Sequence, residues 1–473
     1  MDRTDDQRIA VLDELRRIWE VIAGHEIASR GQLLYDVLAE HLDAPPHEMS
    51  VLSEDVVNHR FVDYDIALEM LAATDPDHRA IGVGGADMRY HFNLADMIQA
   101  PDLPNTTRMP VAKVDYANVA TGPDSERAAM ALGVRLFRYA DTPVAVMLRR
   151  ANPHRGRDTG VVEVLCADHA ISSRVLEEVR TLSMTHSVLR GQVISLAGSG
   201  YEQSTDGVTF IRRPDLPAGH VILPPGVLDR VVDHVVGIAE HAEMLAAQGQ
   251  HLKRGVLLFG PPGSGKTHTV RHLLSVTPRH TVVLLAGDTL RFVGLAAKLA
   301  RAMQPAIVVL EDCDLIAEDR DRYHGAKPLL FEVLDAMDGL DADADVTFVL
   351  TTNRVEAMER ALSQRPGRVD LAVEVPLPDE AGRLALLGLY APAAAFSETV
   401  LRETAGKLAG TTASFSKELI RRAVLAAAKD GTEPGDAHLR TATDEILADG
   451  ERLSRALLGV APATSQEGEF RLI

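Results

Sequence analysis

The stretch that decides the fold is residues 260–267, which read Gly-Pro-Pro-Gly-Ser-Gly-Lys-Thr. It follows the apolar run 256–259, and a helical pattern begins at Gly265. In such a loop, glycines let backbone N–H groups turn toward bound phosphates, and the N-terminus of the next helix adds favourable charge. A strand, this loop and a helix in that order predict a nucleotide-binding P-loop. A glycine-rich turn that matches by chance is the alternative.

Two side chains of the loop have expected chemical roles. Lys266 is expected to reach the β- and γ-phosphates, and the Thr267 hydroxyl is expected to ligate Mg²⁺. His268 directly follows and is counted as a nucleotide contact, although a lone histidine can equally be structural. The expected nucleotide-binding residues of this segment are Gly260, Pro261, Pro262, Gly263, Ser264, Gly265, Lys266, Thr267 and His268.

A pair of acids ends a second apolar run, at 307–310. Carboxylates at the end of a buried strand are costly unless they serve a cation or a reaction. We therefore expect Glu311 to bind the metal and Asp312 to polarise the attacking water. The usual order in such strands is Asp then Glu, so the side-chain lengths are exchanged here and hydrolysis could be slow. A pair of helix-capping acids is the alternative.

Short apolar, β-branched runs alternate with helical patterns through this part of the chain. The predicted strands are 256–259, 281–286, 307–310, 347–351 and 371–375. This alternation is typical of a parallel sheet that is buried on both faces. After Pro376 and Pro378 the apolar residues take helical spacing, which predicts a small helical domain. The fold class is therefore α/β, a P-loop NTPase parallel sheet with a C-terminal helical lid and an N-terminal helical plus α/β region.

The N-terminal part carries weaker signals. Helices are expected at 9–22 and 32–42, and strands at 144–148 and 161–165. Segments 190–196 and 208–211 predict a small β element before a proline-rich linker and an amphipathic helix at 228–239. The expected divisions are 1–75 (helical), 76–190 (α/β, recognition of a substrate or adaptor), 191–218 (β element and linker), 219–378 (ATPase domain), 379–458 (lid) and 459–473 (flexible tail).

Composition limits the class of protein. The 473 residues are 46% hydrophobic and 25% charged, which is typical of globular domains and not of disordered chains. A net charge of −19 without a basic cluster makes nucleic acid an improbable partner. Two cysteines, an acidic N-terminus unlike a leader and the lack of an 18-residue apolar run predict a cytoplasmic protein without a membrane partner.

Several segments together resemble one known family. Beside the P-loop and the acid pair, they are Met337-Asp338-Gly339-Leu340, Thr351-Thr352-Asn353-Arg354, Arg365-Pro366-Gly367-Arg368-Val369-Asp370 and Pro376-Leu377-Pro378-Asp379. Over about residues 218–430, the chain is similar to the AAA clade of the AAA+ ATPases. The resemblance implies Mg²⁺-dependent ATP hydrolysis, with ATP and Mg²⁺ as cofactors, coupled to remodelling, unfolding or threading of a protein.

The resemblance also implies residue roles. Asn353 would hydrogen-bond the water or the γ-phosphate, although a simple strand-end turn is the alternative. Arg365 and Arg368 would enter the neighbouring subunit's site as arginine fingers, unless they are surface ion-pair partners. Fingers supplied in trans require an oligomer, and the family's expectation is a homohexameric ring.

Residues Phe292, Val293 and Gly294 resemble the pore loop with which such rings grip an extended polypeptide. The alternative is that Phe292 is an ordinary core residue of the next helix. A charged loop at 318–327 lies where the family has a second pore loop, and a solvated surface loop is equally compatible. The N-terminal region would select the protein substrate or adaptor.

Three departures from the family pattern stand out. Lys417 replaces a lid glycine near the nucleotide, where it either adds a cation or points to solvent. Residues 220–224 replace the usual adenine-contacting stretch, with Ile222 as an expected backbone contact. The C-terminus 470–473 lacks a penultimate tyrosine, so docking on a proteasome core is not expected. A nucleotide-gated scaffold with slow or no hydrolysis and a nucleic-acid motor remain the alternative functions.

Overall fold

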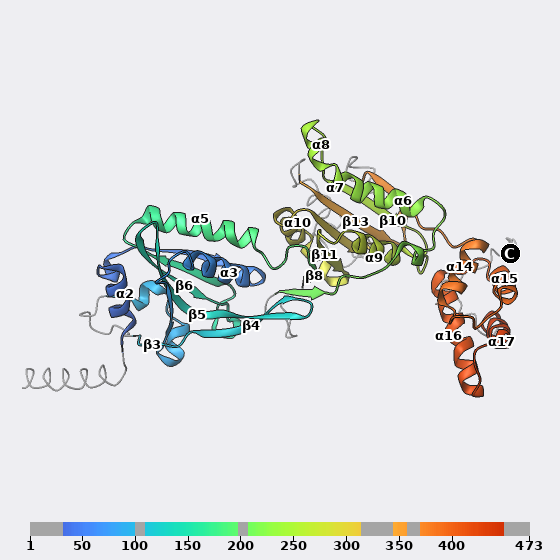
Figure 1. The fold of residues 1–473 in the computed structure, drawn as a ribbon, viewed down its shortest axis with the longest axis horizontal. Coiled ribbons are helices and arrows are strands. Elements are labelled where there is room, and N and C mark those ends of the chain that lie inside the picture. The colour runs from blue at the N-terminus through green and yellow to red at the C-terminus, as the bar shows by residue number, and fades with distance from the viewer. Residues whose placement is uncertain (1–31, 100–108, 197–206, 314–343, 357–368, 449–473) are drawn as a thin grey trace, which may run out of the picture. The chain divides into compact units, whose positions relative to one another are not determined.

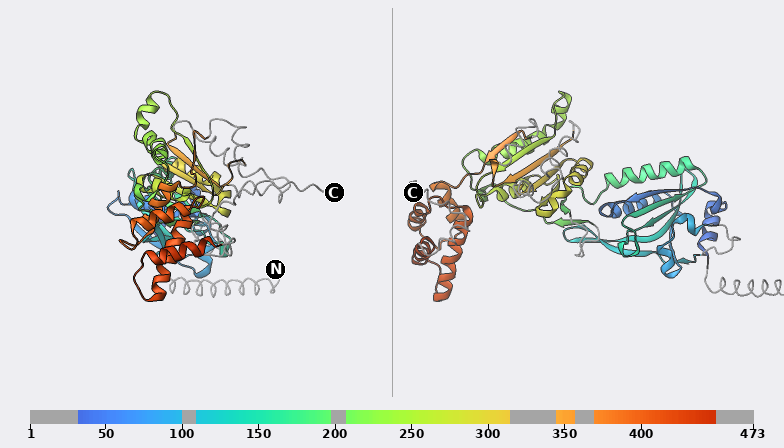
Figure 2. Two further views of the ribbon diagram at one scale, coloured as in Figure 1. Left: turned by 90° about the vertical axis from the view of Figure 1, so that its right-hand side faces the viewer. Right: turned by 180° about the vertical axis from the view of Figure 1, so that it is seen from behind.

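The computed structural model describes residues 32–99, 109–196, 207–313, 344–356 and 369–448, drawn in colour in Figures 1 and 2. The described residues divide into two compact units, one within residues 32–188 together with 207–208, and the other within residues 189–196 and 209–448. The predicted helix at 9–22 lies outside the described residues.

The first unit is built on a seven-stranded sheet in which every registered pair of strands is antiparallel. The strand order is β1-β7-β6-β5-β2-β3, and β4 pairs with β5. The strands are β1 (Val51–Val56), β2 (Arg79–Val83), β3 (Val111–Ala112), β4 (Asp115–Gly122), β5 (Ser125–Tyr139), β6 (Thr142–Arg149) and β7 (Gly160–Leu165).

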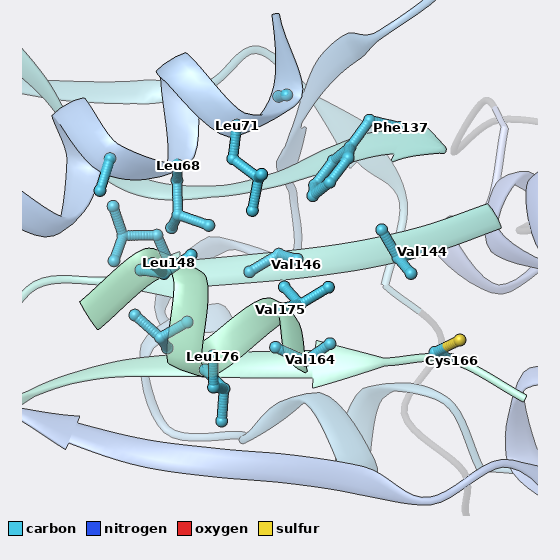
Figure 3. Close-up of a cluster of buried hydrophobic side chains, with 14 of the residues drawn as sticks. Leu68, Leu71, Phe137, Val144, Val146, Leu148, Val164, Cys166, Val175 and Leu176 are labelled. Atoms are coloured by element: carbon cyan, nitrogen blue, oxygen red, sulfur yellow. The ribbon is translucent and has the colours of Figure 1, made fainter. Parts of the chain in front are cut away.

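Helices cover both faces of this sheet. Helices α3 (Phe61–Ala72) and α5 (His169–Thr185) pack on one face, against β6 residues such as Val146, as Figure 3 shows. Helices α2 (Leu34–Leu42) and α4 (Leu94–Met97) pack on the other face, against alternate β6 residues such as Met147. Because successive side chains of a strand point to opposite faces, one fully apolar strand serves both cores. Short 3₁₀ segments complete the unit: η1 (Pro46–Glu48), η2 (Asn58–Arg60), η3 (Ala86–Tyr90) and η4 (Pro153–Arg155).

The predicted helix at 32–42 and the strands at 144–148 and 161–165 are confirmed as α2, β6 and β7. The structure differs from the expectation that residues 1–75 are a separate helical region. Strand β1 pairs along its whole length with β7, and α3 shares a core with α5, so 32–188 fold together. The sequence of β1, Val-Leu-Ser-Glu-Asp-Val, has no clear alternation of apolar and polar residues, so it does not predict a strand. The segment is a strand because it pairs with β7.

The second unit contains another seven-stranded sheet, in the order β14-β10-β13-β12-β11-β8-β9. All five predicted core strands are present and pair in parallel. The strands are β8 (Val193–Leu196), β9 (Val208–Ile211), β10 (Arg254–Phe259), β11 (Thr281–Ala286), β12 (Ala306–Glu311), β13 (Val346–Thr352) and β14 (Leu371–Glu374). The α/β fold class with a buried parallel sheet is confirmed.

Segments 190–196 and 208–211 do not form a β element of their own. Strand β8 pairs in parallel with β11, through Val193 opposite Val282, and so extends the second unit's sheet. Residue Val193 is buried in the same core as the P-loop helix. The physical reason is that β11 would otherwise leave an unpaired apolar edge, which strands tend to cover.

Helices of the second unit flank the sheet (Figure 1). Helix α9 (Lys266–Val276) and helix α6 (Val227–Val232) share a core with the central strands, while α10 (Val293–Ala302) contacts β11 and β12. The predicted amphipathic helix at 228–239 is α6 continued by a π-helical turn, η6 (Asp233–Gly237), and α7 (Ile238–Glu240). The remaining segments are η5 (Ala218–His220), α8 (Ala242–Ala247) and η7 (Gly287–Phe292).

The predicted lid is a bundle of four helices, visible as one group in both Figure 1 and Figure 2. They are α14 (Glu380–Tyr390), α15 (Glu398–Lys407), α16 (Ala413–Asp430) and α17 (Asp436–Leu447), around a shared apolar core. Helix α16 begins where the Thr412 hydroxyl accepts a bond from the Phe415 amide and ends at Gly431, whose φ of 65° suits glycine. No helix among the described residues has the length and apolar character needed to cross a bilayer.

Candidate nucleotide site

The P-loop lies at the carboxyl end of β10, as predicted, and two of its glycines are required by close neighbours. A Cβ on Gly260 (φ 147°) would lie 2.2 Å from the Val375 carbonyl oxygen. A Cβ on Gly263 (φ 74°) would lie 3.0 Å from the Ser414 hydroxyl oxygen of the lid. The loop is therefore pressed between the sheet edge and the lid, and only glycine fits both positions.

Lys266 begins α9, and its side chain is 6% exposed. The ammonium group donates hydrogen bonds to the carbonyl oxygens of Gly260 and Pro261 at 2.8 and 2.9 Å. It also donates to Oδ1 of Asn353 at 2.7 Å. The loop lysine and the strand-end asparagine, 87 residues apart in sequence, are thus brought into direct contact.

The two acids of the pair have different neighbours. Glu311 is half-buried at the end of β12, and its carboxylate accepts a hydrogen bond from the Thr267 hydroxyl. Asp312 is exposed, with a φ of 53°, and its Oδ1 accepts a hydrogen bond from Nδ2 of Asn353 at 3.4 Å. The Asp312 amide donates to the Thr351 hydroxyl at 3.0 Å, which fixes this backbone conformation.

The electrostatics of Glu311 follow from this position. Burial raises the pKa of its carboxyl above the usual range, and the neighbouring Asp312 charge raises it further. The Arg271 cation and the Thr267 hydrogen bond act in the opposite direction. A carboxyl with a raised pKa gains from a nearby cation, because the cation offsets the cost of keeping the charge in a partly buried place.

A cavity of about 430 Å³ opens beside these residues. Its walls come from residues 220–223, the P-loop, the ends of β12 and β13, and the lid. The predicted contacts Ile222 and His268 both line it. Burial, together with the Arg271 and Lys417 charges, lowers the pKa of His268, so this side chain is neutral near pH 7. Lys417, left open by the sequence, faces the cavity and supplies a cation.

Sequence reasoning missed several further wall residues. Arg271 lies one helical turn after Thr267 on α9, and this spacing could have revealed it. Leu386 and Tyr390 come from lid helix α14 and supply an apolar side to the cavity. Their positions depend on how the lid packs, which the motif spacing does not encode.

The residues present fit a magnesium-bound triphosphate. The P-loop leaves no side chain in the way at Gly260 and Gly263, and Lys266, Arg271 and Lys417 supply positive charge at the cavity. The Ser264 hydroxyl is 3% exposed and has no hydrogen-bond partner among the described residues, which suits an oxygen-rich ligand. Thr267 and Glu311 offer the two oxygens that a magnesium ion with phosphate and water ligands would use.

The predicted pore residues occupy the start of α10. Phe292 is half-buried, with the Arg291 guanidinium 4.8 Å from its ring centre, and Gly294 is exposed. Val293 is 1% exposed, because it packs into the unit as the first residue of α10. The pore-loop assignment stays a prediction. Arg365, Arg368, the loop 318–327 and the C-terminus 470–473 lie outside the described residues.

Comparison with known proteins agrees with this geometry. Residues 256–377 match the family model described as ATPase family associated with various cellular activities (AAA). The chain is 31% identical over 268 residues to ATP-dependent zinc metalloprotease FtsH 3 of Sphaerobacter thermophilus, covering 54% of each protein. It is 34% identical over 182 residues to the proteasome-activating nucleotidase of Methanoregula boonei, covering 36% of this chain and 42% of that protein.

A third relative is ATP-dependent zinc metalloprotease YME1L of Drosophila melanogaster, 33% identical over 234 residues, with 47% of this chain and 31% of that protein covered. The chain thus spans about half or less of the length of these relatives. The family match runs from β10 through the P-loop, the acid pair and Asn353 to the segment after β14. The match assigns residues 256–377 to an ATPase domain of the AAA family.

Proposed function

We propose that this protein hydrolyses ATP in a Mg²⁺-dependent reaction and uses the energy to remodel, unfold or thread a protein. The observation that carries the proposal is the hydrogen-bonded series from Lys266 through Asn353 to Asp312 beside the P-loop cavity. In this series Lys266 is the cation for the phosphates, Asn353 the amide that orients the neighbouring groups, and Asp312 the proton acceptor.

Each residue has a defined task in this proposal. Lys266 exchanges its carbonyl partners for phosphate oxygens, and the P-loop amides surround the same group. Thr267 and Glu311 hold Mg²⁺, which neutralises charge on the phosphates when bound. Arg271 and Lys417 add positive charge from α9 and from the lid.

Asp312 is the proposed general base. Its Oδ1 is held by the Asn353 amide, which leaves Oδ2 to accept a proton from water as the water oxygen bonds to the γ-phosphorus and the bond to the leaving phosphate oxygen breaks. The exposure of Asp312 gives water access to the carboxylate. The exchanged acid order is then explained by contacts, since Glu311 reaches Thr267 and Asp312 reaches Asn353.

A steady-state phosphate-release assay, paired with binding of a fluorescent ATP analogue, tests this assignment. Lys266→Ala is expected to lower nucleotide affinity and to reduce hydrolysis at least ~100-fold, whereas Asp312→Asn is expected to slow hydrolysis ~100-fold or more with binding retained. A wild-type protein that binds the analogue but releases no phosphate would instead support the nucleotide-gated scaffold. Wild-type rates in Lys266→Ala would contradict both functions.

The finer proposal is a ring, a homohexamer in which Arg365 and Arg368 complete the neighbouring subunit's site. Its support is the sequence resemblance and the similarity to AAA-family relatives. Mixing inactive Lys266→Ala subunits with inactive Arg368→Ala subunits tests it, because a mixed ring contains some sites with both an intact loop and an intact finger. We expect the mixture to recover ATP hydrolysis. A mixture that stays inactive, or a protein that stays strictly monomeric at saturating ATP, would refute the ring.

We also propose that the first unit selects the protein substrate or adaptor and that Phe292 contacts the substrate. The proposed contact of Phe292 with substrate is supported by the position of its half-buried aromatic ring near the exposed Gly294. For the location of the protein we propose the cytoplasm. Cys166 and Cys313 are both buried and form no disulfide within the described residues, which fits a reducing compartment. Phe292→Ala, assayed for unfolding of a tagged reporter protein against unchanged basal ATP hydrolysis, tests the gripping role.

A further inference from the structure

The first unit has a second cavity, of about 190 Å³, far in sequence from the P-loop. Arginines Arg149, Arg150 and Arg157 line it, together with Tyr90, Asn152 and alanines of β4 and β5. We call this the arginine cavity. Three guanidinium groups gather at one small cavity, although the chain as a whole has a net charge of −19. Like charges repel one another, so the fold must hold these groups together.

Arg149 is the buried member of the group, 3% exposed at the end of β6. One terminal nitrogen donates to the Phe92 carbonyl oxygen, and the other lies 3.6 Å from a carboxylate oxygen of Glu163. Its Nε is buried and has no hydrogen-bond partner among the described residues. Burial and the Arg157 charge lower the pKa of Arg149 to about 10, so the side chain still carries its charge near pH 7. A buried cationic donor without a protein partner is available to donate to a bound acceptor.

Arg157 adds a second charge from the facing loop. The loop is closed by the Asn152 amide, which donates to the Arg157 carbonyl oxygen at 2.8 Å. The Arg157 side chain donates to the His91 carbonyl oxygen at 2.6 Å. Within the described residues it forms no ion pair with a carboxylate, in contrast to Arg149 with Glu163 and Arg155 with Asp87. Its charge still acts on Glu163, whose pKa it lowers, so Arg149 and Arg157 share this one carboxylate.

The walls of the cavity are held in place by other contacts. The Tyr90 hydroxyl donates to Asp115 at 2.9 Å, and the guanidinium groups of Arg155 and Arg89 lie 4.0 and 4.7 Å from the centre of its ring. At the β4–β5 bulge, the Arg150 amide donates to the Ala131 carbonyl oxygen at 2.8 Å. Bulges often re-aim residues near functional sites. These contacts hold the wall residues around the cavity in place.

We propose that the arginine cavity binds an oxyanion, a carboxylate or phosphate group, through Arg149 and Arg157. Guanidinium forks match the paired oxygens of these groups, and the volume accommodates such a group with a few attached atoms. The two sources of this chemistry are a small free anion and the carboxylate end of a peptide. The proposal concerns the first unit alone and does not depend on ATP hydrolysis.

Isothermal titration calorimetry of the full-length protein tests the proposal, with a saturating non-hydrolysable ATP analogue present to cover the P-loop. The probes are inorganic phosphate, acetyl-tetraalanine with a free carboxylate, and the same peptide with an amide end. Saturable one-site binding of phosphate or of the carboxylate peptide is expected, with the amide peptide at least ~10-fold weaker than its carboxylate twin.

Two variants and a control locate the site. Arg157→Ala removes a charge, and Ala117→Leu fills the cavity while keeping every charge; each is expected to weaken binding at least ~10-fold. Arg79→Ala, an exposed arginine of β2 outside the cavity, removes the same charge and is expected to bind as the wild type does. Phosphate binding alone identifies a phosphate site, and carboxylate binding alone a peptide-end site. Binding by neither probe, or unchanged binding in Arg157→Ala and Ala117→Leu, would overturn the proposal.

Discussion

The ammonium group of Lys266 lies 2.7 Å from Oδ1 of Asn353, so the P-loop and the carboxyl end of β13 share one hydrogen bond. The amide nitrogen of Asn353 turns the other way, toward Asp312. Asn353 therefore links the cation to the proposed base, and its amide orientation is fixed by donors and acceptors on opposite sides.

Replacing Asn353 by alanine should separate catalysis from binding. The loop keeps its other contacts to nucleotide, so affinity should stay within ~3-fold, while kcat should fall ~10- to 100-fold because Asp312 loses the group that orients it. Phosphate release and analogue binding, measured together, check this. Asn118→Ala, on an exposed part of β4, is the matched control. A loss of affinity that equals the loss of kcat would show that Asn353 acts through binding alone.

Lys417 should influence ATP more than its exposed position suggests, because it faces the cavity from the lid. Lys417→Ala is expected to raise the KM for ATP ~5- to 10-fold, since one charge-assisted contact to a phosphate is lost. Lys429→Ala removes the same charge from the far end of α16 and should leave KM unchanged. Equal KM values for both variants and the wild type would show that Lys417 points its charge to solvent.

Gly263→Ala should weaken nucleotide binding without unfolding the protein. The substitution forces a Cβ to 3.0 Å from the Ser414 hydroxyl and keeps a φ of 74°, which together cost on the order of 1–3 kcal/mol. Analogue affinity is expected to fall ~10-fold. Gly219→Ala, where a Cβ meets nothing within 4 Å, is the control. If Gly263→Ala bound nucleotide normally, the loop and the lid would not be in tight contact.

The stability of the first unit should fall below neutral pH because of His59. Burial, with help from the Arg60 charge, lowers the pKa of His59 to about 4, below the usual 6.5. The unfolded chain therefore takes up a proton first as pH falls through 6.5, and this contribution to stability declines until about pH 4. Between pH 7 and pH 5 the loss is at most about 2 kcal/mol, at ~1.36 kcal/mol per unit.

Scanning calorimetry of the wild type and His59→Gln at both pH values measures this contribution. The variant, which cannot titrate at this position, should lose less stability than the wild type over the same interval. An identical pH dependence in the two proteins would mean that His59 does not titrate between these pH values.

Much of the second unit could be predicted because its signals are local. The P-loop, the acids after β12 and the apolar strands each occupy a short continuous segment, and motif spacing fixed their order. The motifs place Lys266, Asn353 and Asp312 in one site, and the hydrogen bonds join these three residues. The position of Tyr390 in the cavity wall could not be predicted, because it depends on how the lid helices pack against the P-loop.

The first unit was less predictable because its regularity comes from distant pairings. Strand β1 has alternating half-buried and exposed residues and gains its identity from β7, more than 100 positions later. The arginine cavity likewise assembles Tyr90, Arg149 and Arg157 from separate elements, and no spacing between them carries a motif. The burial of Val293 could not be predicted either, because a hydrophobic residue at a helix start is compatible both with substrate contact and with the core.

The residues that line the cavity beside the P-loop extend in sequence from His220, in η5, to Lys417, in the lid. A molecule that contacts both would join the four-helix bundle to the sheet, and we expect its departure to free the bundle to move about the connection at Pro376 and Pro378. Protection of that connection from proteases should consequently rise when nucleotide is bound and fall when it leaves.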